Sequence, residues 1–140
     1  MKTNYILIDL ENVQPNNLEI LKGHDFKVIV FVGANQTKIS FDLAIAMQSL
    51  GSTAEYIKID GNGPNALDFH IAFYIGQISA IDNNCYFHII SKDSGFDPLI
   101  RHLKSKKIYA QKEKILLKYH CLKYLIPNHP QKELMQLLNF

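Results

Sequence analysis

Tryptophan is missing from this sequence, and cysteine is scarce, with two residues among 140. Cys85 and Cys121 lack the spacing of a thiolate metal site, so we expect both to be reduced and to pack as small apolar side chains. No apolar run reaches the roughly 18 to 20 residues of a membrane-spanning helix. The first short apolar run is followed directly by Asp9 and not by a signal-peptide cleavage site. We therefore expect a cytoplasmic protein without a membrane segment.

Linkers, repeats and low-complexity tracts are absent as well. With 47% hydrophobic residues, a chain close to the typical domain length of about 150 residues can bury one core. The sequence predicts one main domain at residues 1–110 and a C-terminal helical extension, 111–140, packed on it. The extension has an apolar helical stripe interrupted by Pro127 and Pro130. It could cover the core, or it could present a surface to a second copy or a protein partner.

Short apolar runs alternate with helical patterns in the main domain. Strands are predicted at residues 5–8, 26–32, 54–59, 86–90 and 107–110, and helices at 15–22, 41–50, 65–81 and 98–104. This alternation favours a three-layer α/β/α sandwich around a parallel sheet of about five strands, with Rossmann-like topology. In such a sheet the carboxyl ends of the strands share one edge, where ligands bind.

Acidic residues gather at that predicted edge. Asp9 and Asp93 both follow apolar strands at their carboxyl ends. Asp68 lies in the first turn of the helix after the third strand, and Asp97 opens the helix after the fourth. Clustered carboxylates repel one another, so such a cluster usually holds a cation. Oxygen donors select Mg²⁺ or Mn²⁺, and no histidines or cysteines have the spacing of a zinc site.

Each acid also has a purely structural interpretation. Asn65 and Asp68 resemble a capping box at a helix start. Asp97, followed by proline, is typical of a helix N-cap. A turn aspartate would explain Asp9 or Asp93 singly, but it would not explain why both apolar strands end in acid.

Polar neighbours extend the candidate site. Asn12 could orient a metal-bound water, contact a substrate or simply occupy a turn, and Glu11 and Ser91 could contribute or point away. Residues 1–91 hold five lysines and nine acids, whereas residues 92–123 hold nine Lys or Arg and three acids. The basic segment could attract a polyanion or form the solvated face of two helices. The candidate phosphate or base contacts are Asn35, Gln36, Lys38, Lys92, Arg101 and Lys104.

Three stretches resemble the signature blocks of NYN/PIN-like ribonuclease domains. They are ILIDLENV at 6–13, GPNALD at 63–68 and ISKDSGFDPL at 90–99, and the resemblance spans residues 4–110. It implies an α/β/α fold, a pocket that binds Mg²⁺ or Mn²⁺, and hydrolysis of RNA phosphodiester bonds. The catalytic residues that it implies are Asp9, Asn12, Asp68, Asp93 and Asp97. Gly95 departs from the pattern, because many relatives have an aspartate there.

The sequence thus predicts a metal-dependent ribonuclease acting on single-stranded or looped RNA, whose backbone enters a strand-end pocket more easily than a stiff duplex does. Its predicted metal ligands are Asp9, Asp68, Asp93 and Asp97. Three alternatives remain: a weakly active or inactive module that binds RNA or a partner, a toxin-type ribonuclease of a toxin–antitoxin pair, and another phosphotransfer enzyme such as a phosphatase. The last is disfavoured because the segment after the first strand lacks the D-x-D-x-T/V pattern of haloacid dehalogenase-like phosphatases.

Overall fold

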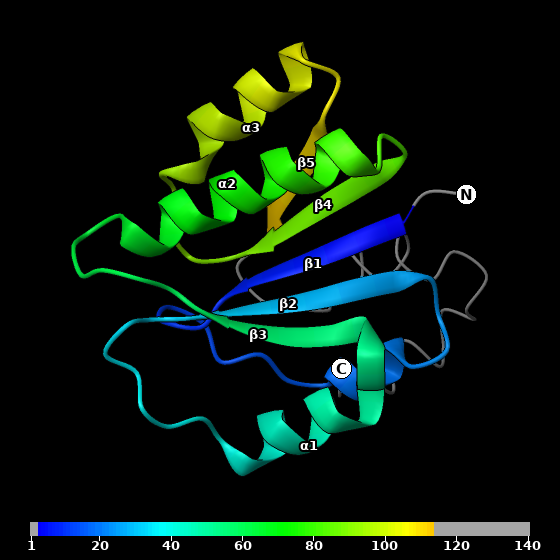
Figure 1. The fold of residues 1–140 in the computed structure, drawn as a ribbon, viewed down its shortest axis with the longest axis vertical. Helices are drawn as coiled ribbons and strands as arrows, with labels where there is room; N and C mark the ends of the chain where they lie inside the picture. Colours follow the sequence, from blue (N-terminus) through cyan, green and yellow to red (C-terminus); the bar gives the residue numbers. More distant parts are fainter. Residues whose placement is uncertain (1–2, 114–140) are drawn as a thin grey trace.

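The computed structural model describes residues 3–113. They form one sheet of five parallel strands in the order β3-β2-β1-β4-β5 (Figure 1). The strands are β1 (Thr3–Asp9), β2 (Phe26–Val32), β3 (Ala54–Lys58), β4 (Cys85–Ile90) and β5 (Tyr109–Glu113). The predicted parallel sheet is confirmed. Because β5 ends at Glu113, residues 111–113 continue the sheet; the rest of the expected extension lies outside the described residues.

Helices cover both faces of the sheet. On one face lie the 3-10 turn η1 (Leu18–Leu21) and helix α1 (Phe41–Leu50), and on the other lie α2 (Ala66–Ile81) and α3 (Phe96–Ser105). A second 3-10 turn, η2 (Gly51–Thr53), follows α1. None of the helices within residues 3–113 is long and apolar enough to cross a membrane. Cys85 is buried as expected, and its thiol donates a hydrogen bond to the Asp82 carbonyl at 3.0 Å.

The alternation of side chains along β1 divides the core in two. Ile6 and Ile8 pack against η1 and α1, whereas Tyr5 and Leu7 pack in the core under α2 and α3. Successive side chains of a strand point to opposite faces, so Asp9 shares the face of Tyr5 and Leu7. The last residue of β1 therefore points toward the side of the sheet that α2 covers.

The helix predicted at residues 15–22 is wrong in type and length. Only Leu18–Leu21 form a helical turn, and it is a 3-10 turn. Asn17 at its start adopts a left-handed conformation, with φ of 57°, which an α-helix that begins earlier cannot contain. Burial of Leu18 and Leu21 on one side of the turn is enough to explain the apolar pattern.

The chain order places a topological switch point between β1 and β4. From β1 the chain adds β2 and β3 on one side, and then returns through α2 to place β4 and β5 on the other side. Figure 1 shows that the carboxyl ends of the strands and the first turns of α2 and α3 lie at one edge of the molecule. Open α/β sheets bind ligands at such a point, and Asp9 ends one of the two strands that flank it.

Candidate active site

Asp9 is a fully buried carboxylate at the switch point, with 0% of its surface exposed. Its Oδ2 accepts hydrogen bonds from Asn12 Nδ2 at 2.7 Å and from Ser91 Oγ at 2.8 Å. Its Oδ1 is buried and has no hydrogen-bond donor among the described residues. A buried carboxylate oxygen without a donor is costly unless a cation or a proton meets it.

Ser91 connects the ends of the two central strands. It follows β4 directly and is fully buried. While its Oγ donates to Asp9, the same oxygen accepts a hydrogen bond from the backbone N–H of Asp93 at 3.0 Å. Ser91 therefore fixes the position of Asp93 relative to Asp9.

Asp68 and Asp93 form a carboxylate pair. Asp68 occupies the first turn of α2, and its side chain hydrogen-bonds that of Asp93. Burial, the bond to Asp93 and the negative charges of Asp93, Asp9 and Glu11 raise the pKa of Asp68 to about 7. The backbone N–H of Gly95 donates to Asp93 Oδ1 at 2.8 Å and, together with Asp68, lowers the pKa of Asp93. The two carboxylates thus share a proton near neutral pH, which a divalent cation could replace.

Glu11 brings a further negative charge to this group. The chain turns sharply after β1, where the N–H groups of Asn12 and Val13 both donate to the carbonyl of Asp9. The side chain of Glu11 then lies over Gly33, after β2, where a Cβ would stand 2.7 Å from Glu11 Cδ. Gly33 leaves the space that Glu11 occupies, and the sequence pattern alone gave no sign of that contact.

Asp97 does not join these side chains. It is exposed in the first turn of α3, and its charge is not among those that shift the pKa of Asp68 or Asp93. It is also not the predicted N-cap, because the helix begins at Phe96 with Gly95 as its cap. Phe96 is buried in the core under α3. This burial favours a helix that already includes Phe96 in its first turn.

The capping-box interpretation of α2 is also wrong. Asn65 is the N-cap residue, but its side chain makes no capping hydrogen bond. Asp68 instead directs its carboxyl group to Asp93. In the part of the chain that the structure describes, no three His, Cys, Asp or Glu side chains stand close enough to hold one metal ion as they are placed.

A family model of the PIN domain matches residues 3–113. The chain belongs to the PIN domain family. PIN domains are generally nucleases, and they generally use divalent metal ions. No curated protein and no solved structure matches the chain.

The basic candidates lie at different distances from the carboxylates of this PIN domain. Lys92 is exposed between Ser91 and Asp93. Arg101 is exposed in the middle of α3, and Lys104 lies in its last turn, about 12 Å along the helix axis from its start. Lys112 of β5, one of the nine Lys or Arg residues of segment 92–123, is close enough for its charge to lower the pKa of Asp93.

The loop after β2 holds the remaining candidates. Gln36 ties two loops together, because its Oε1 accepts from Gly33 N at 2.7 Å and its Nε2 donates to the Leu10 carbonyl at 3.3 Å. Lys58 Nζ in turn donates to the Gln36 carbonyl at 2.7 Å. Asn35 and Lys38 are exposed in the same loop. Gln36 therefore has a structural role in the PIN domain, whereas Asn35 and Lys38 remain accessible.

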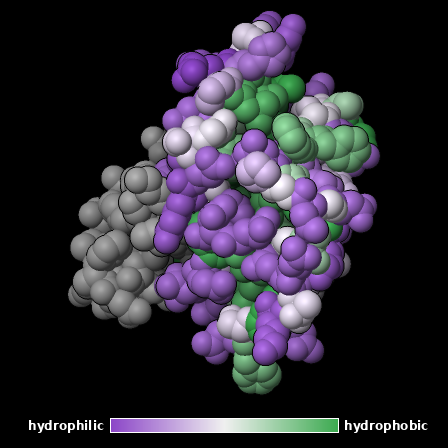
Figure 2. All heavy atoms as spheres, turned by 90° about the vertical axis from the view of Figure 1, so that its left-hand side faces the viewer, coloured by the Kyte–Doolittle hydropathy of each residue, from purple (hydrophilic) through white to green (hydrophobic). Residues whose placement is uncertain are grey.

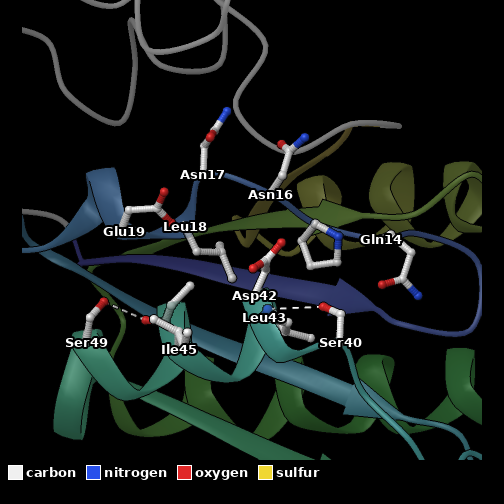
Figure 3. Close-up of a pocket in the computed structure, with 12 residues that line it drawn as sticks. Gln14, Asn16, Asn17, Leu18, Glu19, Ser40, Asp42, Leu43, Ile45 and Ser49 are labelled. Carbon is white, nitrogen blue, oxygen red and sulfur yellow. Dashed lines mark hydrogen bonds between the residues drawn. The ribbon is translucent and has the colours of Figure 1, made fainter.

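A separate hollow of about 660 Å³ lies on the other side of the sheet (Figure 3). Segment 14–19 and α1 line it, with Leu18 and Leu43 among its apolar residues and Glu19 and Asp42 among its acids. None of its lining residues is Lys or Arg. It is therefore poorly suited to a phosphate group, and Asp9, Asp68 and Asp93 do not border it. Figure 2 looks onto the carboxyl edge of the sheet, where hydrophilic side chains cover the centre of the face.

Proposed function

We propose that this PIN domain is a ribonuclease that hydrolyses phosphodiester bonds of single-stranded RNA with Mg²⁺ or Mn²⁺. The observation that carries the proposal is the carboxylate arrangement at the switch point between β1 and β4. Asp9 is buried with one oxygen lacking a donor, and Asp68 and Asp93 hydrogen-bond each other beside it. Such an arrangement weakens a fold unless a cation neutralises it, and this is a reason to keep it for function.

The donor set fits a hard divalent cation. All the candidate donors are carboxylate oxygens, supplied by Asp9, Asp68 and Asp93, and Mg²⁺ is usually held by one or two carboxylates, with waters and substrate phosphate completing its shell. A cation bound there would polarise a phosphate oxygen and lower the pKa of a bound water for attack at phosphorus. Asp97 is left out of the proposed ligand set because it is exposed and apart from the others.

The surrounding residues hold this set in place. Asn12 and Ser91 both donate to Asp9 Oδ2, which leaves Oδ1 as the oxygen available to a cation. Gly95 N–H holds Asp93 Oδ1. Glu11 adds negative charge that acts on Asp68 and so favours a cation in the same place. Binding of one cation by all three carboxylates would require Asp68 and Asp93 to exchange their mutual hydrogen bond for contacts with the cation, because no three acidic side chains of residues 3–113 are placed to hold one ion.

Positive charge beside the carboxylates would receive the RNA backbone. Lys92 stands next to Asp93 in sequence and is exposed, and Lys112 acts electrostatically on Asp93 from β5. Arg101 lies farther along α3 and would contact a phosphate away from the scissile bond. Contacts of this type position a strand without reading its sequence.

The test compares cleavage of labelled single-stranded RNA, with Mg²⁺ or Mn²⁺, by the wild type, Asp9→Asn and Asp93→Asn. Both variants keep the side-chain shape but lose a ligand charge, and we expect cleavage rates lower by on the order of 100-fold. Asp25→Asn, at an exposed position outside this edge, is the matched control and should cleave like the wild type. Metal-dependent cleavage that is equal in all four proteins would reject the proposed site. Tight RNA binding without any cleavage would favour an RNA-binding module instead.

A further inference from the structure

Two phenylalanines stand exposed on the outer face of α2. Phe69 is 70% exposed and Phe73 is 58% exposed. The buried residues of α2 are Leu67, Ile71 and Ile75. At 3.6 residues per turn, Phe69 and Phe73 lie on the opposite side of the helix, pointing away from the sheet. Exposed rings next to each other on one helix form an apolar patch of the kind that serves as a binding site in other proteins.

The pair begins at the carboxylate site. Phe69 directly follows Asp68 in the first turn of α2, which lies at the carboxyl edge of the sheet. Residues four apart on a helix have their Cβ atoms about 5 to 6 Å apart. The rings of Phe69 and Phe73 are therefore neighbours on the outer face of α2, with Phe69 nearer to Asp68 and Phe73 one turn farther along the helix. Figure 2 shows hydrophobic surface beside the hydrophilic centre, on the flank where α2 lies.

Phe73 is also held in place by the core. Its ring packs edge-on against that of Tyr74, with centroids 5.1 Å apart and an interplanar angle of 82°. The Tyr74 ring contacts Phe31 of β2, with centroids 5.6 Å apart. The exposed ring is thus anchored through two aromatic contacts to a fully buried residue. An anchored ring loses little freedom when a planar ligand stacks on it.

We propose that Phe69 and Phe73 stack bases of a single-stranded RNA whose backbone occupies the carboxylate site. This inference rests on the proposed function, and it names the substrate contact that lies outside the reacting phosphate. Every base has a flat face, so stacking on aromatic rings binds single strands with little sequence preference. The charge of α2 suits this, because Asp68 is the sole Asp, Glu, Lys or Arg between residues 66 and 81. No second carboxylate on this helix repels a phosphate chain that passes Phe69.

The size of the patch favours bases over a second protein chain. A stable protein interface buries about 800 Å² on each partner, whereas two aromatic side chains supply about 150 to 250 Å² each. Ile81, the next exposed large apolar residue on α2 and 85% exposed, lies about 12 Å beyond Phe73 along the helix. Two rings therefore match two bases better than they match a dimer interface.

The experiment measures binding of two probes by fluorescence anisotropy, in EDTA so that no cleavage occurs. One probe is a labelled 12-nucleotide single-stranded RNA, and the other is an abasic ribose-phosphate chain of the same length. We expect each alanine substitution, Phe69→Ala and Phe73→Ala, to weaken RNA binding about fivefold or more. Binding of the abasic chain should change less than twofold. Phe41→Ala, which removes a ring that is 78% exposed on α1, is the control and should leave both affinities unchanged.

Three results would overturn the inference. Equal losses for both probes would mean that the rings act on the backbone or on the fold, and no loss for RNA would mean that they do not bind it. Sedimentation that shows a dimer in the wild type and a monomer in Phe69→Ala would assign the rings to a second copy. Phe73→Trp, which keeps a stacking face, should restore RNA affinity.

The proposed hydrolysis is tested separately. Wild type and Asp93→Asn are assayed on bis(4-nitrophenyl) phosphate, a diester without bases, in Mn²⁺. A wild type that cleaves neither this compound nor RNA contradicts the proposed function, while the comparison of RNA with the abasic chain still decides whether the rings stack on bases.

Discussion

At the scale of single residues, the site is defined by which carboxylate oxygens already have partners. Asp9 Oδ2 accepts two hydrogen bonds, whereas its Oδ1 has no donor among the described residues. Asp93 is held by Gly95 and by Asp68, which carries the proton of the pair. The free oxygen and the shared proton mark where a cation would enter. The buried oxygen without a donor and the close carboxylates lower the stability of the metal-free fold, as is usual for residues of a binding site.

Asp68→Asn should make the metal-free protein more stable above neutral pH. The pKa of Asp68 is raised from 3.8 to about 7 in the folded state, so the folded protein holds a proton there that the unfolded chain has lost. The resulting stabilisation is full below about pH 4 and is lost as the pH rises through 7. In EDTA, we therefore expect the Tm of the wild type, relative to that of Asp68→Asn, to fall between pH 5 and pH 8.

Metal addition gives the matching control. At pH 8, millimolar Mn²⁺ should raise the Tm of the wild type by several degrees through binding to the folded state. It should raise the Tm of Asp68→Asn much less. Asp97→Asn, at an exposed acid outside the group, should behave like the wild type in both experiments. Parallel Tm curves for all three proteins would show that Asp68 does not carry this strain.

At the scale of elements, a buried polar row joins three strands. His88 of β4 is 1% exposed. Its Nε2 lies 3.0 Å from Asn4 Oδ1 in β1, and its Nδ1 lies 3.2 Å from Gln111 Nε2 in β5. A neutral ring that donates from Nε2 and accepts at Nδ1 satisfies both neighbours. Burial lowers the pKa of His88 from 6.5 to about 4.

Acid should therefore lower the free energy of unfolding of the protein through His88. Below pH 6.5, His88 is protonated in the unfolded chain but stays neutral in the folded protein until the pH nears 4. The free energy of unfolding therefore falls as the pH drops from 6.5 toward 4. One pKa unit is worth about 1.4 kcal/mol, so the fall approaches about 3 kcal/mol. Urea unfolding at pH 7 and pH 4.5 should show a larger loss in the wild type than in His88→Gln. His102→Gln, at an exposed histidine, should lose as much as the wild type; equal losses in all three would contradict the assignment.

Elements were easier to predict from the sequence than contacts between them. Apolar runs predicted the strands, and the helical pattern at residues 41–50 predicted α1 with its observed bounds. The start of α3 was misplaced because a helix-capping pattern at Asp97 is local, whereas the burial of Phe96 is not. The place of Glu11 over Gly33 depends on two loops that meet only once β1 and β2 pair. Such contacts have no periodic signature in the sequence.

At the scale of the whole molecule, the acidic and the basic side chains occupy neighbouring but separate regions, an arrangement that suits an anionic polymer. The carboxylates lie at the ends of β1 and β4 and on the first turn of α2. The exposed cations follow them on α3, with Arg101 nearer than Lys104 to the helix start. In the proposed function, RNA would approach the acidic centre from the flank that supplies positive charge.

This arrangement predicts a graded effect of charge reversal on RNA binding. Arg101→Glu lies closer to the carboxylates along α3 than Lys104→Glu does, so it should weaken binding of single-stranded RNA more. Lys22→Glu, at an exposed lysine after η1, should have little effect. The logarithm of the association constant decreases linearly with the logarithm of the salt concentration. For each phosphate contact removed, this slope should become less steep by about 0.7, as for single strands. Titrations at 50 and 200 mM salt measure both quantities. A wild-type affinity that does not change with salt would contradict phosphate contacts by α3, and equally by Lys92 and Lys112.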